Sequence, residues 1–180
     1  MASRTPEWIK ESFKTFRPGP IAETATPGTW LSVRTDTPGL HTFTDRRYSP
    51  EPLPGHGDGM YVQLEGAGVV TFTLNEPVTN LYFGIWSPNG SRGTAHARYF
   101  GVSGGTLGEV DHPIEQTGQI AIFTGPGMIA GVDISRNDSS PHHVCVDNFS
   151  TVEEDQLESL KALAKKKPTM DDILNLGRKR

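Results

Sequence analysis

The stretch VDISR (Val132–Arg136), followed by HVCVDNFS (His143–Ser150), decides the fold class of this chain. Apolar and polar residues alternate in both, which is the period of a β-strand with one buried face. The second stretch closes a long region of this character. After Ser150 the chain becomes charged, and its apolar residues take helical spacing. The sequence therefore predicts a β domain followed by a helical tail.

The composition agrees with an all-β fold. The 180 residues include 20 glycines and 14 prolines, and only 34% are hydrophobic. A turn-rich antiparallel fold suits this composition better than a helix bundle does. Nine or ten short strands at regular spacing predict a β-sandwich of the jelly-roll type, although a barrel stays open. We expect these strands at 30–34, 40–44, 60–64, 68–74, 78–86, 94–102, 106–111, 119–124, 127–135 and 143–150.

Short helices are expected at both ends of the sandwich domain. Residues 1–20 are predicted to form an N-terminal amphipathic helix, since Thr5 and Pro6 are a good helix start and Phe13 and Phe16 recur at helical spacing. The sandwich itself would occupy residues 21–150.

The C-terminal tail, residues 151–180, is predicted to hold two helices. Thr151 and Glu154 match a capping box that opens the first helix. A helix of this length is marginal alone, so its apolar stripe needs a surface. It would pack on its own sandwich or zip against a second copy, giving a homo-oligomer. The residues assigned to partner binding are Leu157, Leu160, Ile173 and Leu174.

Charge and cysteine content limit the partners and the compartment. The net charge of −4 gives no basic field, so nucleic-acid binding is unlikely. Cys145 is the only cysteine, which excludes an intrachain disulfide and favours a reducing compartment. No run could span a membrane, and the N-terminus has no apolar signal core. Localisation is left unknown: a cytoplasmic chain, part of an assembled particle, or a chain whose signal was removed.

Residues 55–150 resemble the jelly-roll modules of bacterial exported proteins of the PEP-CTERM type and, more distantly, carbohydrate-binding modules. The resemblance is carried by the order of four segments: an apolar strand, a Pro-Val turn leading into a glycine-containing strand, and two closing strands. They are residues 66–74, 77–85, 129–135 and 146–150.

The resemblance implies a possible calcium site. Asp147 matches the acidic position in the last strand, where related carbohydrate-binding jelly rolls often hold a structural calcium ion. Calcium takes six to eight oxygen ligands from several segments, and Asp58 in a glycine-rich loop is a further donor. The alternative, which we favour, is that the Asp147 carboxylate bonds the backbone of a turn.

Sugar binding would use flat aromatic rings. Trp86, Tyr82 and Tyr99 are the candidates, with Trp86 the best because it stands at a strand end beside a turn. The alternative, favoured about two to one, is that these rings fill the core.

No pattern predicts an enzyme. His142, His143 and Cys145 lie close together, but no nucleophile elbow, CxxC, HExxH or P-loop is present. Two functions stay open. The first, slightly favoured, is a non-catalytic binding module for glycan or for calcium-stabilised adhesion. The second is a structural or assembly protein, such as a virion decoration subunit or other shell-attached protein, anchored by its terminal helices.

Overall fold

The computed structural model describes residues 10–11, 13, 16–23, 26–27, 30–45, 60–87, 93–114, 119–136 and 143–165. Ten strands and one helix lie within them, in the order β1 (Gly19–Pro20), β2 (Thr26–Pro27), β3 (Leu31–Thr35), β4 (Thr42–Asp45), β5 (Met60–Leu64), β6 (Val69–Trp86), β7 (Gly93–Gly101), β8 (Thr106–Ile114), β9 (Gln119–Arg136), β10 (Val144–Ser150) and α1 (Glu154–Ala164). All of the strand pairs are antiparallel. The predicted all-β, antiparallel fold is confirmed.

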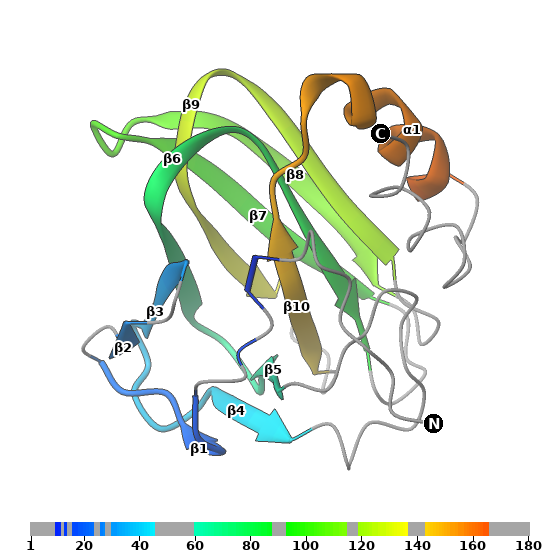
Figure 1. Cartoon of the computed structure of the whole chain (residues 1–180). Coiled ribbons are helices and arrows are strands. Elements are labelled where there is room, and N and C mark those ends of the chain that lie inside the picture. Colours follow the sequence, from blue (N-terminus) through cyan, green and yellow to red (C-terminus); the bar gives the residue numbers. More distant parts are fainter. Residues whose placement is uncertain are drawn as a thin grey trace.

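The strands form one continuous sheet that folds over on itself. Its order is β1-β4-β5-β10-β6-β9-β7-β8, with β3 also beside β6 and β2 beside β3. The bent strands β6 and β9 belong to both layers (Figure 1). Sheet I contains β2, β3, residues 69–74 of β6, residues 129–136 of β9, β7 and β8. Sheet II contains β1, β4, β5, β10, residues 80–86 of β6 and residues 119–124 of β9.

The bends explain why four of the expected strands join into two long ones. The expected strands 68–74 and 78–86 both correspond to parts of β6, and 119–124 and 127–135 are both part of β9. The β6–β9 ladder changes register between Thr73 and Val78 and again before Asn80. Pro77 lies at this bend in β6, and Pro126 lies between the paired segments of β9. Proline cannot donate to a ladder, so pairing stops locally there, and the chain turns into the second layer without ending the strand.

The core lies between the two layers and is rich in phenylalanine. The Phe149 ring stacks on Phe72 of sheet I, with 4.6 Å between centroids, and on Phe83 of sheet II at 4.9 Å. Phe149 reaches this place because β10 is irregular after Asp147 and Asn148 has a φ of 56°. Asparagine tolerates this left-handed conformation. The irregularity reverses the alternation, so that Phe149 points inward instead of Asn148.

The predicted N-terminal helix is wrong for the residues that the structure describes there. Glu11 forms an antiparallel bridge with Phe149, and Phe13 has a φ of 56°, which is incompatible with a right-handed helix. Phe13 and Phe16 instead enter the core, where Phe16 stacks on Phe43 at 4.5 Å. Burial of the aromatic rings outweighs local helix propensity, because a short helix alone is barely stable. Residues 1–9 lie outside the described residues.

The predicted C-terminal helix is confirmed as α1, which begins at Glu154 rather than next to Thr151. Asn80 of β6 holds the chain just before it. The Asn80 amide nitrogen donates to the Val152 carbonyl oxygen at 2.9 Å, and its Oδ1 accepts from the Val152 N–H at 3.0 Å and from the Thr151 hydroxyl at 3.2 Å. The Asn80 side chain thus gives the backbone of Val152 the hydrogen bonds that a neighbouring strand would otherwise provide.

The helix packs on its own sandwich. Val152 and Leu157 join an apolar cluster on the outer face of sheet II. The sheet contributes Tyr82 and the half-buried Ile120 and Ile122 to this cluster. Leu157 therefore packs on its own sandwich, which was the first of the two roles expected for the apolar stripe of the helix. The Leu160 side chain lies outside the described residues, as do Ile173, Leu174 and the second predicted helix. In the described part of the chain, no helix is long and apolar enough to cross a membrane.

Candidate functional site

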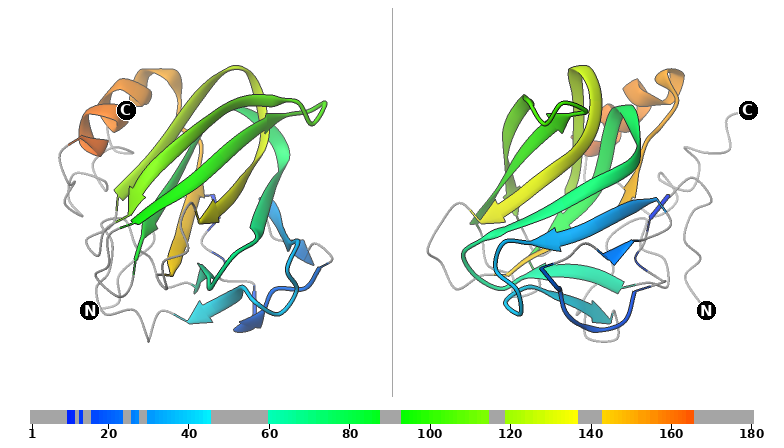
Figure 2. Two further views of the ribbon diagram at one scale, coloured as in Figure 1. Left: turned by 180° about the vertical axis from the view of Figure 1, so that it is seen from behind. Right: turned by 90° about the vertical axis from the view of Figure 1, so that its left-hand side faces the viewer.

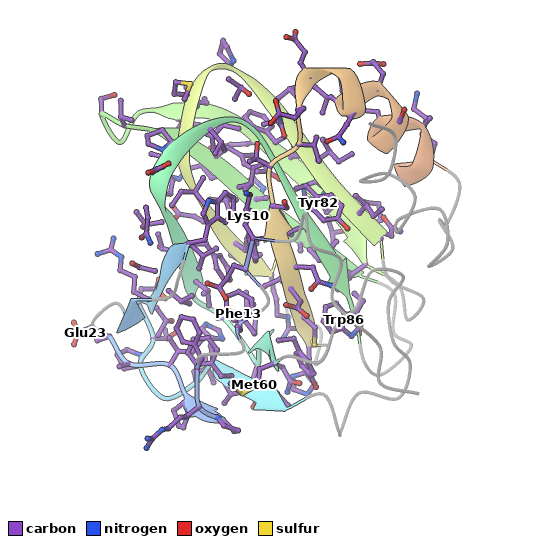
Figure 3. The ribbon with its side chains drawn as sticks, viewed as in Figure 1. Lys10, Phe13, Glu23, Met60, Tyr82 and Trp86 are labelled. Atoms are coloured by element: carbon purple, nitrogen blue, oxygen red, sulfur yellow. The ribbon has the colours of Figure 1, made fainter. Side chains whose placement is uncertain are left out.

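The three aromatic rings predicted to bind sugar are all buried. Trp86 and Tyr82 are 1% exposed and Tyr99 is 0% exposed. Trp86 and Tyr82 stand on the outer face of sheet II (Figure 3), where Trp86 packs edge-on against Tyr61 at 5.1 Å. Tyr99 points into the core between the layers. No face of these rings is open to a ligand, and they take the core role that was the favoured alternative.

Asp147 is also buried, in the middle of β10. Its Oδ1 accepts the Asn148 N–H at 2.6 Å, which is the local backbone bond given above as the alternative to calcium. Asp58 lies outside the described residues. Among the residues that are described, no group of three or more His, Cys, Asp and Glu side chains is placed to hold a metal ion. Calcium at Asp147 stays a prediction.

Cys145 does not have the environment of a nucleophile. The side chain is fully buried beside Tyr61 and Trp86. Burial, with a smaller contribution from Glu65, raises the pKa of the Cys145 thiol well above its usual value. The thiolate is the reactive form of cysteine, so this residue is an inert, protonated core group at neutral pH.

Two histidines, the buried His41 and the half-buried His112, are structural as well. The Glu65 N–H donates to His41 Nδ1 at 3.2 Å, so the neutral ring carries its proton on Nε2 and donates to Thr37 Oγ1 at 3.0 Å. Burial lowers the pKa of His41. The Nε2 atom of His112 is 3.0 Å from the Tyr99 hydroxyl oxygen. Burial lowers the pKa of His112 to about 4, although the nearby charge of Asp111 acts in the opposite direction.

Among the residues that the structure describes, the outer face of sheet I is a continuous polar surface with partly or fully exposed side chains. Its near strands β7, β8 and β9 are in front in the left view of Figure 2. The register of the ladders places three rows of side chains on this face. We call these residues the polar face. The first row is Ser32, Thr73, Gly131, Phe100 and Thr106, the second is Arg34, Thr71, Asp133, Arg98 and Glu109, and the third is Val69, Ser135, His96 and Asp111.

Phe100 forms a flat apolar platform in the first row. A Cβ atom at Gly131 would come within 2.5 Å of Phe100 Cζ and 3.0 Å of Cε2. The ring therefore occupies the space that a side chain at position 131 would need, and it lies over β9 instead of standing away from it. Phe100 stays half-buried in this position. Glycine at 131 is what allows the platform to form.

Arg98 stands beside this platform and is held in place by three hydrogen bonds. Its Nε donates to Asp133 Oδ2 at 3.0 Å, its Nη2 donates to the same oxygen, and its Nη1 donates to Thr106 Oγ1 at 3.2 Å. The guanidinium carbon is 5.7 Å from the centre of the Phe100 ring, within the range of a cation–π contact. The planar cation is thus held over the aromatic ring and in contact with it.

The edge of the polar face is acidic. His96 Nδ1 is 2.8 Å from Asp111 Oδ1, and His96 Nε2 is 3.8 Å from Glu109 Oε2. Both carboxylates are on β8, which no described strand other than β7 pairs with. Charged residues of this kind protect a sheet edge from pairing with another chain.

Sequence reasoning missed this face, although its signal is present. In the predicted strand 94–102, His96, Arg98 and Phe100 occupy alternate positions, while Ala95, Ala97 and Tyr99 occupy the others. Small and buried residues on one side leave the other three side chains facing outward. An aromatic residue that follows two polar ones at the outward positions was the available indication.

Comparisons with known proteins find no family and only distant structural neighbours. No protein-family model and no curated protein matches the chain, so the resemblance to PEP-CTERM-type modules stays a prediction. Among solved structures, the carbohydrate-binding module TmCBM61 in complex with beta-1,4-galactotriose aligns with a TM-score of 0.45 at 12% identity, over 69% of this chain and 88% of that chain. A mutant of the family 29 carbohydrate-binding module CBM29-2 aligns with a TM-score of 0.47 at 10% identity, over 75% and 91%. The K1 cleaved adhesin domain of Lys-gingipain from Porphyromonas gingivalis W83 aligns with a TM-score of 0.46 at 11% identity, over 71% and 92%.

Proposed function

We propose that this chain is a non-catalytic glycan-binding module and that its ligand lies on the polar face. The observation that carries the proposal is the Phe100 ring lying on Gly131 beside the fixed guanidinium of Arg98. Pyranose rings present apolar C–H faces, which pack on an aromatic ring, and hydroxyls at their rims, which need donors and acceptors close by. Phe100 and Arg98 supply both features at one place.

The dimensions of the polar face suit an extended ligand. It crosses five strands, β3, β6, β9, β7 and β8. With strands about 4.8 Å apart the face is roughly 19 Å wide, and its rows are about 7 Å apart. Serine, threonine and charged side chains extend on both sides of Phe100, so neighbouring sugar units would find hydrogen-bond partners there.

The carboxylates of the polar face support binding rather than catalysis. Asp133 accepts from Arg98, and Asp111 is paired with His96. The side chains stand on the open surface of a sheet, whereas catalytic groups are normally gathered in a concave site that excludes water. We therefore assign Asp133 to the positioning of Arg98 and Asp111 to the positioning of His96.

The test is a glycan array followed by calorimetric titration of the best soluble ligand. Phe100→Ala is expected to weaken the affinity at least tenfold, because the stacking platform is removed. Val102→Ala is the matched control, since Val102 is also apolar, is 72% exposed and lies in the β7–β8 turn outside the polar face. Each variant is checked for an unchanged circular dichroism spectrum. Equal affinity of Phe100→Ala and the wild type would contradict the proposed site.

A further inference from the structure

The surroundings of Arg98 determine what kind of glycan the polar face accepts, an inference that rests on the proposed function. A guanidinium group has five N–H donors. Three of those of Arg98 are used by Asp133 and Thr106. One donor remains on Nη1 and one on Nη2. Two donors on neighbouring nitrogens match a pair of neighbouring oxygen atoms on a ligand.

A pair of adjacent hydroxyls and a carboxylate could each supply such oxygens, and the charges of the polar face distinguish them. Asp133 contacts the guanidinium directly, so the charge of Arg98 is already compensated. Glu109 is the register neighbour of Arg98 on β8, and Asp111 follows it on the same face. Counting Arg34 and Arg98 against Asp133, Glu109 and Asp111, with histidine neutral, the polar face carries a net charge of −1.

We propose that the polar face selects uncharged glycans with two adjacent hydroxyls and excludes acidic sugars, and that Asp133 is the residue responsible for the exclusion. Hydroxyl oxygens accept the two remaining N–H donors of Arg98 without adding charge. A sugar carboxylate bound to these donors would bring a further negative charge next to Asp133. Asp133 is only 16% exposed, so water and salt screen this repulsion less than they would for a fully exposed acid.

The decisive variant is Asp133→Asn. The amide oxygen of asparagine still accepts from Arg98, so the guanidinium keeps its orientation, but its charge is no longer compensated. A free guanidinium binds a carboxylate through two parallel hydrogen bonds. Glu109→Gln is the matched control, because it also removes one negative charge from the polar face, but from a residue whose carboxylate faces His96.

The experiment compares neutral polysaccharides (β-glucan, galactan, mannan and dextran) with polygalacturonate and alginate by affinity electrophoresis, at low and at high salt. For the wild type we expect binding to at least one neutral polymer and at least tenfold weaker binding to both acidic polymers. Asp133→Asn should strengthen binding to an acidic polymer at least fivefold, and Glu109→Gln should change it less than twofold.

The outcomes separate this inference from the proposed function. If no polymer of either kind binds, the proposed function fails and the inference fails with it. If neutral polymers bind through Phe100 but the wild type holds acidic polymers equally well, only the selectivity is wrong. If Asp133→Asn and Glu109→Gln behave alike towards acidic polymers, Asp133 is not the excluding residue.

Discussion

Acid should destabilise this protein through His112. The half-buried ring packs between Tyr99 and Phe83, and the loss of solvation there lowers its pKa from 6.5 to about 4. The unfolded chain therefore takes up this proton at a higher pH than the folded chain does. The stabilising contribution of the neutral ring is fully present above pH 6.5 and is lost as the pH falls towards 4. The difference between the two pKa values corresponds to about 3 kcal/mol of unfolding free energy at pH 4.

Urea denaturation at pH 7 and at pH 4 measures this contribution when the wild type is compared with His112→Gln. Glutamine has no titrating group but can still accept from the Tyr99 hydroxyl. The loss of unfolding free energy between pH 7 and pH 4 should be smaller in His112→Gln by about 3 kcal/mol. Carboxylates and His41 contribute equally in both proteins, so the difference isolates His112. The stability of the variant at pH 7 does not affect the result, since only the change in unfolding free energy with pH is compared.

Tyr99→Phe is the control for this experiment. It removes the hydroxyl that lies 3.0 Å from His112 but leaves the ring buried, so it should keep the pH dependence of the wild type. If the wild type and His112→Gln lose the same unfolding free energy on acidification, His112 is not a buried neutral group in the folded state. The account of the Tyr99–His112 contact would then be wrong.

Two further substitutions test the fold where it supports the candidate site. Asn80→Ala should lower the unfolding free energy by about 2–4 kcal/mol in urea denaturation, because it leaves the buried N–H and C=O of Val152 without their partner. Hydrogen exchange in α1 should speed up in this variant, and unchanged exchange would mean that the helix is held by other contacts. Gly131→Ala should cost about 1–3 kcal/mol and abolish glycan binding, because its Cβ would lie 2.3 Å from the Phe72 carbonyl oxygen and 2.5 Å from Phe100 Cζ. Retained affinity in a folded Gly131→Ala protein would show that the Phe100 platform is not needed.

Strand positions were predictable from the sequence because alternation is a local property. The phase of VDISR is read correctly, with Val132 and Ile134 in the core and Asp133 outside. The joining of strands across Pro77 was not predictable in the same way. A proline beside a polar residue looks like a loop, and only the pairing of Asn80 with Thr124, 44 residues away, shows that the chain continues into the second layer.

The prediction of an N-terminal helix was wrong for a related reason. Phe13 and Phe16 are three residues apart, which suits one face of a helix. The same spacing also suits an irregular segment whose rings enter an existing core. The choice depends on whether a cavity between Phe43, Phe72 and Phe149 is there to be filled, and no local pattern contains that information.

The candidate site depends on the same two factors. One is the local alternation of side chains along a strand, and the other is burial by a segment that is distant in the sequence. Tyr82 and Phe100 both point away from the space between the layers, so alternation alone treats them as equals. Tyr82 is buried because Asn80, two residues earlier, fixes Val152 and brings α1 onto sheet II. Phe100 stays partly open because its neighbours on sheet I are short or charged side chains. Docking of the tail on sheet II thus makes sheet I the accessible face. An Asn80 variant that releases α1 should therefore expose Tyr82 while leaving glycan binding at Phe100 unchanged.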